Sequence, residues 1–500
     1  MRKLIERNPL LTVFGLTFLC LLPILIGRDF TPSNELRYLS IADEALRDGN
    51  VFAFYNHGIP YADKPPLYLW IVIACKWLLG HHSMFVLSLF SLIPAYLIIY
   101  IMDKWLRSEH VVSPATRAAT ALMMLSTAMF AGSAVVLRMD MLMTLFIVLA
   151  LWSFYKLYRH IGNERRERWL LPLWIFLALF SKGPVGFFMP VLVIVVFLAL
   201  RRELNRFSQF LGWKAWALMF GLFALWILGV WIDGGTPYIK NLLLHQTVGR
   251  AVNSFSHDKP FLYYFLHIWW IAAPWIFLSA YLVWNNWETR RSSVTEHLFL
   301  TTIIVTFLML SSFSAKLGVY MLPILPMVVY LIPVIQSRTA KPVWQDKAVT
   351  IGVLTFFALA FAAGLFIARI NPYIGYGPLC KAIPADATVS TLYVPRPENM
   401  DVYLGHPVTD YARTPDTFLA TLTDSTSTAT ATATDTTSNA TTATATDTNI
   451  ADYTPNTAGN TNRPRVLIVK TAKITPGTPL ATFTSSHPTT PIGPYTLVTY

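Results

Sequence analysis

The sequence is poor in charge for its length. Of its 500 residues, 13% are charged and 54% are hydrophobic, whereas about 25% of the residues of a typical soluble protein are charged. Apolar runs of roughly 18–22 residues recur along the chain, which is the length of helix that crosses a bilayer. The composition therefore argues against a soluble globular protein and predicts an all-α polytopic membrane protein.

Cysteine is also scarce. The three cysteines are Cys20, Cys75 and Cys380, and two of them lie in apolar segments, so we expect neither a disulfide framework nor a zinc site of paired cysteines. No small-residue cleavage site follows the first apolar run, which ends at Ile26. We therefore predict that this run is an uncleaved first transmembrane helix.

The net charge of +12 comes largely from short loops between the apolar runs. Such loops are typical of the cytoplasmic side of a membrane protein rather than of a nucleic-acid surface. Five are predicted to face the cytoplasm, at 103–110, 158–168, 201–206, 285–291 and 336–347. All five face the cytoplasm only if segment 66–79 does not cross the bilayer, because a full crossing there would place all five on the outer side.

This sidedness defines the predicted domains. Residues 1–369 are expected to form a transmembrane domain of about 11–13 helices. Residues 28–83 are expected to form a large first extracytoplasmic loop that carries interfacial helices. The spans are predicted at 10–27, 84–102, 117–135, 141–158, 168–180, 184–200, 214–232, 264–284, 297–312, 317–335 and 347–369.

The region after the last span, 370–500, should be a small extracytoplasmic α/β domain. Strand-like runs occur at 388–394, 401–405 and 465–472. Between them, 421–462 consists mostly of Thr, Ala, Ser and Asp, a composition that cannot bury a core. We predict that it is a disordered insertion into this domain.

Charged residues lie beside the apolar runs of the first outer loop, where they cost free energy unless they are solvated, paired or bound to a ligand. The motif NELRY contains Glu35 and Arg37, and the motif DKPP contains Asp63 and Lys64. The same sidedness places LRMD at 137–140, SKGP at 181–184, the stretch 233–260 from DGG to HDKP and FSAKL at 313–317 on this face. A transporter would rather place its polar groups near the bilayer midplane, so the pattern favours an enzyme that acts on an anionic, lipid-linked substrate.

The order of these motifs resembles a known family. An E-x-R-Y motif in the first outer loop is followed by K-P-P before an aromatic helix, R-x-D after the third span and K-G-P after the fifth. A long outer loop and S-x-x-K-L-x-x-Y-x-L-P-x-x-P complete the series. The order resembles the ArnT-like branch of the membrane-embedded GT-C glycosyltransferases, which is related to the protein O-mannosyltransferases, over about residues 1–340.

The resemblance implies an activity and partners. Such enzymes take a sugar from a polyprenyl-phosphate donor and transfer it, with inversion at the anomeric carbon, to an acceptor on the extracytoplasmic face. The acceptors it allows are lipid A, another glycolipid or the hydroxyl groups of a protein. It further implies an integral protein of the bacterial inner membrane whose active site faces the periplasm.

The resemblance also assigns roles to residues. Arg37, Lys64 and Tyr320 are expected to bind the donor phosphate, and a cation and a bidentate guanidinium suit that task. The family has Asp-Glu where this chain has Asn34-Glu35. An amide cannot act as a carboxylate base, so the catalytic candidates are Glu35, Asp140, or Asn34 in a positioning role.

The remaining candidates are cations and one metal pair. Residues expected to bind the acceptor or a phosphate are Arg138, Lys182, Arg250, His257, Lys259 and Lys316. No cofactor is assigned, but some relatives hold a divalent ion between the acidic residue before Lys-Pro-Pro and a histidine of the long loop. Here those ligands would be Asp63 and His245 or His257.

Four alternatives remain open from the sequence. Arg37 and Lys64 could also be simple anchors whose charged ends lie at the lipid headgroups. Arg138 and Asp140 could also form an ion pair that caps a helix. The hydropathy suits a lipid-linked sugar flippase or transporter. The amide at position 34 also suits a catalytically altered relative that acts as a scaffold.

Overall fold

The chain folds into two compact units in the computed structural model. The structure describes residues 2–242, 259–286, 293–337, 347–412, 414–427 and 463–500. The first unit comprises residues 1–28 and 38–368, and the second comprises 29–37 and 369–500. Residues 29–37 of the predicted first outer loop therefore belong to the same unit as the C-terminal region.

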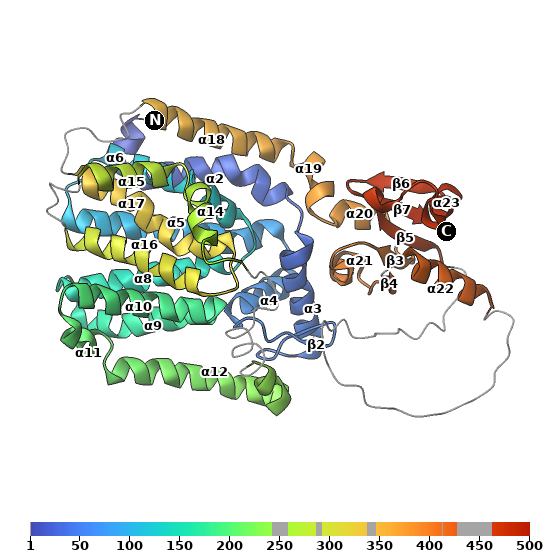
Figure 1. The fold of residues 1–500 in the computed structure, drawn as a ribbon, viewed down its shortest axis with the longest axis horizontal. Helices are drawn as coiled ribbons and strands as arrows, with labels where there is room; N and C mark the ends of the chain where they lie inside the picture. The colour runs from blue at the N-terminus through green and yellow to red at the C-terminus, as the bar shows by residue number, and fades with distance from the viewer. Residues whose placement is uncertain (1, 243–258, 287–292, 338–346, 413, 428–462) are drawn as a thin grey trace. The chain divides into compact units, whose positions relative to one another are not determined.

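The first unit is helical (Figure 1). Its elements are α1 (Arg2–Arg7), α2 (Pro9–Gly27), α3 (Arg37–Asp48), β1 (Tyr55–Asn56), β2 (Ile59–Pro60), α4 (Leu67–Leu79), α5 (Met84–Glu109), α6 (Pro114–Leu125), α7 (Ala128–Val135), α8 (Asp140–Tyr158), α9 (Glu164–Lys182), α10 (Pro184–Leu200), η2 (Leu204–Arg206), α11 (Phe207–Phe210), α12 (Trp213–Lys240), α14 (Tyr263–Ile271), α15 (Trp275–Asn285), α16 (Val294–Ser312), η4 (Gly318–Ile324), α17 (Leu325–Gln336) and α18 (Lys347–Leu365). Helix α19 (Ile367–Ile374) begins at the end of the first unit and continues into the second.

The predicted all-α membrane fold is confirmed. Among the described residues, six helices are long and apolar enough to span a membrane, or up to nine if each of three bent helix pairs is one span. This count is below the predicted 11–13 because α10 has 17 residues and α9 begins with the charged run ERRER. Helix α4 has 13 residues and is about 20 Å long, too short for a hydrocarbon core of about 30 Å.

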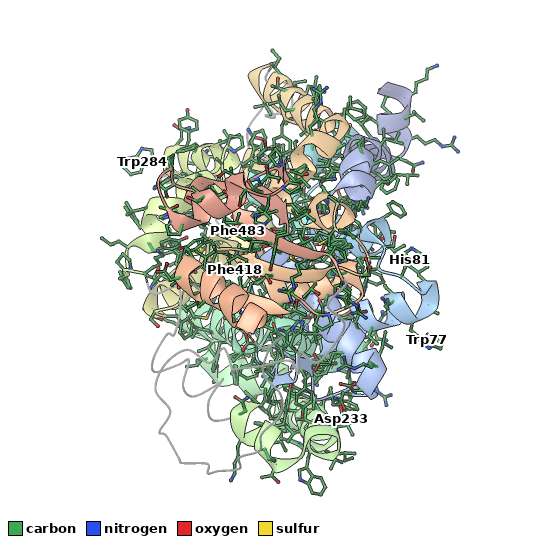
Figure 2. All side chains as sticks on the ribbon, turned by 90° about the vertical axis from the view of Figure 1, so that its right-hand side faces the viewer. Trp77, His81, Asp233, Trp284, Phe418 and Phe483 are labelled. Atoms are coloured by element: carbon green, nitrogen blue, oxygen red, sulfur yellow. The ribbon has the colours of Figure 1, made fainter. Side chains whose placement is uncertain are left out.

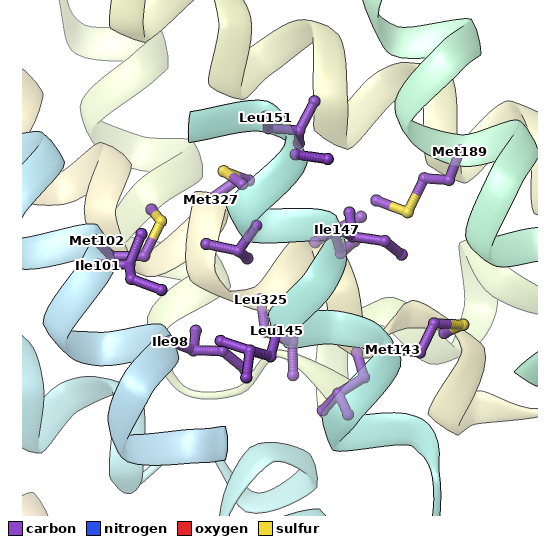
Figure 3. Close-up of a cluster of buried hydrophobic side chains, with 14 of the residues drawn as sticks. Ile98, Ile101, Met102, Met143, Leu145, Ile147, Leu151, Met189, Leu325 and Met327 are labelled. Carbon is purple, nitrogen blue, oxygen red and sulfur yellow. The ribbon is translucent and has the colours of Figure 1, made fainter. Parts of the chain in front are cut away.

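Helix α8 lies at the centre of the helical unit. The 18-residue apolar window of α8 is 83% buried. Figure 3 shows its Ile147 and Leu151 packed among Met102 of α5, Met189 of α10 and Met327 of α17. A helix that is apolar on all sides is stable only when other helices or lipid surround it, so α8 forms the axis on which the bundle is built.

The C-terminal end of α8 gathers polar residues of three predicted basic loops. Tyr155 donates a hydrogen bond to Glu109 at 2.6 Å, Tyr158 donates one to Glu203 at 3.0 Å, and Lys156 pairs with Glu167. Since α8 has 19 residues and is therefore about 28 Å long, these loops lie one bilayer thickness from Asp140. The predicted loops at 285–291 and 336–347 lie largely outside the described residues.

The second unit contains a mixed sheet of five strands in the order β4-β3-β5-β7-β6. The strands are β3 (Thr388–Leu392), β4 (Asp410–Ala412), β5 (Arg465–Lys470), β6 (Thr489–Ile492) and β7 (Tyr495–Thr499). The strand β3 is parallel to β4 and β5, whereas β7 is antiparallel to β5 and β6. The predicted small C-terminal α/β region is confirmed.

Helices complete this unit. They are α20 (Gly377–Lys381), η6 (Pro397–Met400), α21 (Asp401–Leu404), α22 (Pro415–Ser427), η8 (Thr471–Lys473) and α23 (Pro479–Ser485). Figure 2 shows Phe418 of α22 and Phe483 of α23 close together, with ring centroids 5.6 Å apart. These rings cover the buried Leu392, Leu467 and Val498 of the sheet.

Two local predictions for the tail need correction. The predicted strand at 401–405 is instead the helix α21, which ends at Gly405 with φ 72°. The carboxylate of Asp401 accepts the N–H of Val402 at 2.8 Å, a local bond that favours a helix start. The predicted disordered insertion 421–462 begins inside α22, which continues to Ser427, and residues 428–462 lie outside the described residues.

Candidate active site

The site begins with two helices of equal length. Helices α8 and α9 each have 19 residues and run antiparallel, so the first residue of α8 meets the last residue of α9. These residues are Asp140 and Lys182, and the Lys182 ammonium donates to the Asp140 carboxylate. The helix dipoles favour an acid at a helix N-terminus and a base at a C-terminus, so each charge sits at the helix end that stabilises it.

Further cations surround this carboxylate. The guanidinium Nε of Arg138 lies 3.1 Å from Oδ2 of Asp140, and Lys64 also acts on Asp140 electrostatically. The side chain of Asp140 is 2% exposed and that of Lys182 is 9% exposed, so little water screens the cluster. Lys182 also lies 4.2 Å from the ring centroid of Tyr320. Two cations thus pair with one buried carboxylate beside a tyrosine, an arrangement suited to an anion.

The turn after Lys182 depends on two glycines. Gly183 has φ 111° and ends α9 while it begins α10, a conformation that side chains other than glycine rarely adopt. A Cβ added at Gly186 would lie 2.2 Å from the carbonyl oxygen of Ala178. Helices α9 and α10 therefore approach closely, and this contact limits the positions that Lys182 can reach.

The chain that carries Lys64 is held by an acid on α12. The Oδ2 atom of Asp233 accepts the backbone N–H groups of Val51, Phe52 and Ala53 at 2.8, 2.7 and 2.9 Å. The hydroxyl of Tyr238 adds a bond to the carbonyl of Tyr61 at 2.9 Å. These bonds fix the stretch between α3 and α4, and so they fix the backbone that leads to Asp63 and Lys64.

Two acids of α3 hold the rest of this loop. The Glu44 carboxylate accepts the N–H groups of His57 and Gly58 at 2.6 and 2.8 Å, at the turn between β1 and β2. Asp43 binds His82 at 2.8 Å and Lys76 of α4 at 3.1 Å. Burial alone would raise the pKa of Asp43, but the hydrogen bonds and charges of His82 and Lys76 outweigh it and hold that pKa below its ordinary value.

The second unit contains the remaining N-terminal candidates in a short π-helical turn, η1 (Pro32–Leu36), which runs directly into α3. The Asn34 Oδ1 atom accepts a hydrogen bond from Arg37 at 3.3 Å, and Oε2 of Glu35 accepts the N–H of Thr31 at 2.7 Å. The amide at position 34 therefore accepts a hydrogen bond from the guanidinium of Arg37, and the role of Asn34 in positioning the substrate stays a prediction.

Two of the lysines predicted to bind the acceptor, Lys259 and Lys316, make contacts with backbone groups. Lys316 is 3% exposed, and its ammonium donates to the carbonyl oxygens of Lys259, at 3.0 Å, and Phe313. The backbone N–H of Lys259 donates in turn to Ser314 at 3.2 Å. These bonds are what a lysine makes when it holds a loop in place, so the structure brings Lys259 and Lys316 together through the backbone.

Three predicted residues have no place in this geometry. Arg250, His257 and His245 lie outside the described residues. Of the metal pair, only Asp63 is described, and no group of three or more His, Cys, Asp or Glu side chains that could hold a metal occurs in the described part of the chain.

The sequence alone did not point to Asp43, Glu44 or Asp233. Asp43 and Glu44 are adjacent acids in α3 and Asp233 precedes two glycines, but their partners are backbone N–H groups or distant side chains. The one sequence signal was Gly234-Gly235 beside Asp233. A Cβ added at Gly234 would lie 2.6 Å from the Cβ of Ala53, so a glycine is needed for this close approach.

The fold and several sequences match known proteins. ArnT from Cupriavidus metallidurans bound to undecaprenyl phosphate superimposes with a TM-score of 0.70 at 14% identity, covering 98% of this chain and 97% of that one. The same protein in the apo state gives a TM-score of 0.68 with the same identity and coverage. This chain has the ArnT-type GT-C fold. The resemblance inferred from its motifs is confirmed.

Sequence comparisons agree with the ArnT-type fold. The family model for dolichyl-phosphate-mannose-protein mannosyltransferase matches residues 33–245. An undecaprenyl phosphate-alpha-4-amino-4-deoxy-L-arabinose arabinosyl transferase of Pseudomonas fluorescens is 25% identical over 387 residues, which are 74% of this chain and 63% of that protein. One of Erwinia tasmaniensis is 25% identical over 58% of this chain and 52% of its own length. The chain thus spans between half and two thirds of these relatives.

Proposed function

We propose that this protein is an inverting glycosyltransferase that moves a sugar from a polyprenyl-phosphate donor to an acceptor on the extracytoplasmic face of the membrane. The observation that carries the proposal is the buried cluster at the N-terminal end of α8, where Lys182 and Arg138 pair with Asp140. The relatives named as undecaprenyl-phosphate aminoarabinose transferases support this donor class.

The cluster suits the charge that develops during transfer. When the sugar leaves the donor, the bond between the anomeric carbon and the phosphate oxygen breaks, and negative charge grows on the departing phosphate. Preorganised cations in a poorly solvated site stabilise such charge more than water does. In this proposal Lys64 and Lys182 face the phosphate, Tyr320 lies against it, and Asp140 keeps the cations in place. The motif resemblance adds Arg37, whose guanidinium donates to Asn34, as a phosphate ligand.

The acceptor oxygen that attacks the sugar must either lose a proton during transfer or already be negatively charged. Asp140 is a poor base, because it is ion-paired with two cations and protonation would leave both unpaired in a buried site. We therefore assign the base role to Glu35. A phosphorylated acceptor such as lipid A needs little help from a base, whereas a hydroxyl acceptor needs it. The acceptor classes thus remain lipid A, another glycolipid or a protein hydroxyl, on the periplasmic face of a bacterial inner membrane.

A transfer assay tests the phosphate ligands. Purified protein in lipid vesicles is given a radiolabelled polyprenyl-phosphate sugar and an acceptor, and the labelled acceptor is counted. Lys64→Ala is expected to lower transfer by at least about 100-fold, the usual loss when a donor to transition-state charge is removed. Lys104→Ala, an exposed lysine near the C-terminal end of α5, is the matched control. Full turnover in Lys64→Ala, or sugar-lipid transport without a labelled acceptor, overturns the proposal.

The base is tested with two acceptor classes. Glu35→Gln is expected to lower transfer to a hydroxyl acceptor by about 100- to 10,000-fold. With a phosphate acceptor the loss should be much smaller, because that nucleophile is already ionised at neutral pH. Equal losses with both acceptors would show that Glu35 acts through the fold rather than as a base.

A further inference from the structure

An open groove lies between α9 and α12, far from the candidate active site. Its volume is about 490 Å³, and it is lined by Trp169, Trp213, Lys214, Ala217 and Leu218. This volume lies within the range of about 300–1,000 Å³ that is common for small-molecule sites. Trp169 is 49% exposed and Trp213 is 76% exposed, so both indole rings border the groove without being buried by protein.

The groove lies at the level of the basic loops. Trp169 is 13 positions before Lys182 on α9, which corresponds to about 20 Å along the helix axis. Trp213 begins α12, directly after η2 and α11, and Glu203 beside η2 binds Tyr158 at the C-terminal end of α8. The groove is thus on the side of the bilayer opposite to Asp140. Tryptophan side chains are common at the interface between the bilayer and water.

Positive charge borders one end of this groove. The ammonium of Lys214 lies 5.7 Å from the ring centroid of Trp213. On α9, Arg165 and Arg166 are exposed and stand one helical turn before Trp169, which places them on the same helix face. The other lining residues, Ala217 and Leu218, follow Lys214 into the apolar part of α12. Cations at one end and an apolar floor at the other match the two parts of an anionic lipid.

We propose that this groove is a binding site for an anionic glycerophospholipid of the leaflet on the basic-loop side. The phosphate binds Lys214 and the arginines of the first turn of α9. The part of an acyl chain nearest the headgroup lies along Leu218, between the two indole rings. The charge pattern selects the headgroup, since basic pockets between transmembrane helices attract anionic lipids. The site is independent of the proposed sugar transfer, because it uses none of the residues assigned to that reaction.

Lipid retention measured by native mass spectrometry tests this site. The full-length protein in detergent is mixed with equal amounts of phosphatidylglycerol and phosphatidylcholine, and the bound lipids are counted. We expect one tightly retained phosphatidylglycerol per chain. Lys214→Gln should lower its affinity about fivefold, the effect of one cation at a membrane surface. Trp213→Leu should weaken both lipids, because it removes part of the apolar wall.

Two matched variants make the result specific. Lys104→Gln removes an exposed lysine from the same side of the bundle, and Trp77→Leu removes a tryptophan on α4 that is 74% exposed and points outward (Figure 2). Neither should change retention of phosphatidylglycerol. Equal retention of the two lipids by the wild type, or a loss in Lys104→Gln as large as in Lys214→Gln, overturns the proposal.

Discussion

The Oδ2 atom of Asp29 accepts the backbone N–H of Gly377 at 2.7 Å, although 348 residues separate the two. The hydroxyl of Tyr403 donates to the other carboxylate oxygen, and the N–H of Asp29 donates to Asn371 at 3.0 Å. A Cβ added at Gly375 would lie 2.1 Å from Asp29. One carboxylate therefore binds the segment that contains Asn34 and Glu35 to the C-terminal part of the second unit.

Replacement of this carboxylate should destabilise the second unit. A hydrogen bond to a charged group contributes about 1.5–3 kcal/mol, so Asp29→Asn is expected to cost about that much. Thermal unfolding in detergent, followed by near-ultraviolet circular dichroism, measures the change. Asp386→Asn, at an exposed position of the same unit, should leave the midpoint within error. A similar loss in both variants would mean that Asp29 is no special anchor.

Asp233 should protect three backbone amides from exchange. Its Oδ2 atom accepts the N–H groups of residues 51–53, and these bonds must open before the amides exchange. In Asp233→Ala, exchange in a peptide that covers residues 50–54 should accelerate about 10- to 100-fold, since lost charged hydrogen bonds correspond to about 1.5–3 kcal/mol. Hydrogen-exchange mass spectrometry measures this rate.

The control for Asp233 is Asp48, an acid at the end of α3, shortly before residues 51–53. Asp48→Asn changes a carboxylate that is bound to Arg47 at the surface and should leave exchange at 50–54 unchanged. The transfer reaction should also slow in Asp233→Ala, because the same loop leads to Lys64. Unchanged exchange would show that other contacts hold the loop.

The pair of Asp140 and Lys182 should behave as a coupled unit. Removal of one partner leaves a buried charge without its counterion, which costs about 3–5 kcal/mol. Asp140→Asn and Lys182→Met should each lower the midpoint of thermal unfolding in detergent, and the double variant should recover much of the loss. If the double variant were as unstable as the sum of the single variants, the two side chains would not be paired in the folded protein.

The same variants separate stability from activity. The double variant should remain inactive in the transfer assay, because it lacks the cation that faces the phosphate. Recovery of transfer together with stability would mean that Lys182 serves only the fold.

The contact of Asp43 with His82 and Lys76 should depend on pH. The pKa of Asp43 is held below its ordinary value in the folded protein. As the pH falls, Asp43 therefore becomes protonated in the unfolded chain at a higher pH than in the folded protein. This contribution to stability is complete above about pH 3.9, the ordinary value for Asp, and is lost as the pH falls through the lower folded value.

Unfolding at two pH values tests this contribution. Asp43→Asn should lower the unfolding midpoint relative to the wild type at pH 7, and the difference should narrow at pH 3. Asp386→Asn serves again as the exposed control. If the difference between Asp43→Asn and the wild type stayed constant between these pH values, the carboxylate would contribute no pH-dependent stability.

Much of the helical unit follows from local pattern. The eleven predicted spans coincide with helices or bent helix pairs of the structure, because long apolar runs have few alternatives to a helix in a bilayer. Segment 66–79 is too short to cross, as its length predicts. The tail is harder: 401–405 alternates like a strand, but Asp401 and Gly405 favour the helix α21.

The polar residues show the limit of sequence reasoning. Short motifs single out Asp140 and Lys182 separately, but their pairing depends on the equal lengths of α8 and α9. The roles of Asp29, Asp43 and Asp233 could not be predicted from the sequence, since their partners are backbone N–H groups or side chains far away in the chain. Such partners have no sequence signature, because every residue except proline has an N–H group.

Composition and the length of the apolar runs determined that this protein is a membrane-embedded helical bundle, and loop charge determined its expected orientation. These features are local, because a segment meets the bilayer before it meets its neighbours. Tertiary packing alone decided which cations surround Asp140, and it decided that residues 29–37 join the C-terminal unit. The physical reason is that a buried charge takes whichever partner the packed helices and loops bring within hydrogen-bonding distance, and that distance is unrelated to separation along the chain.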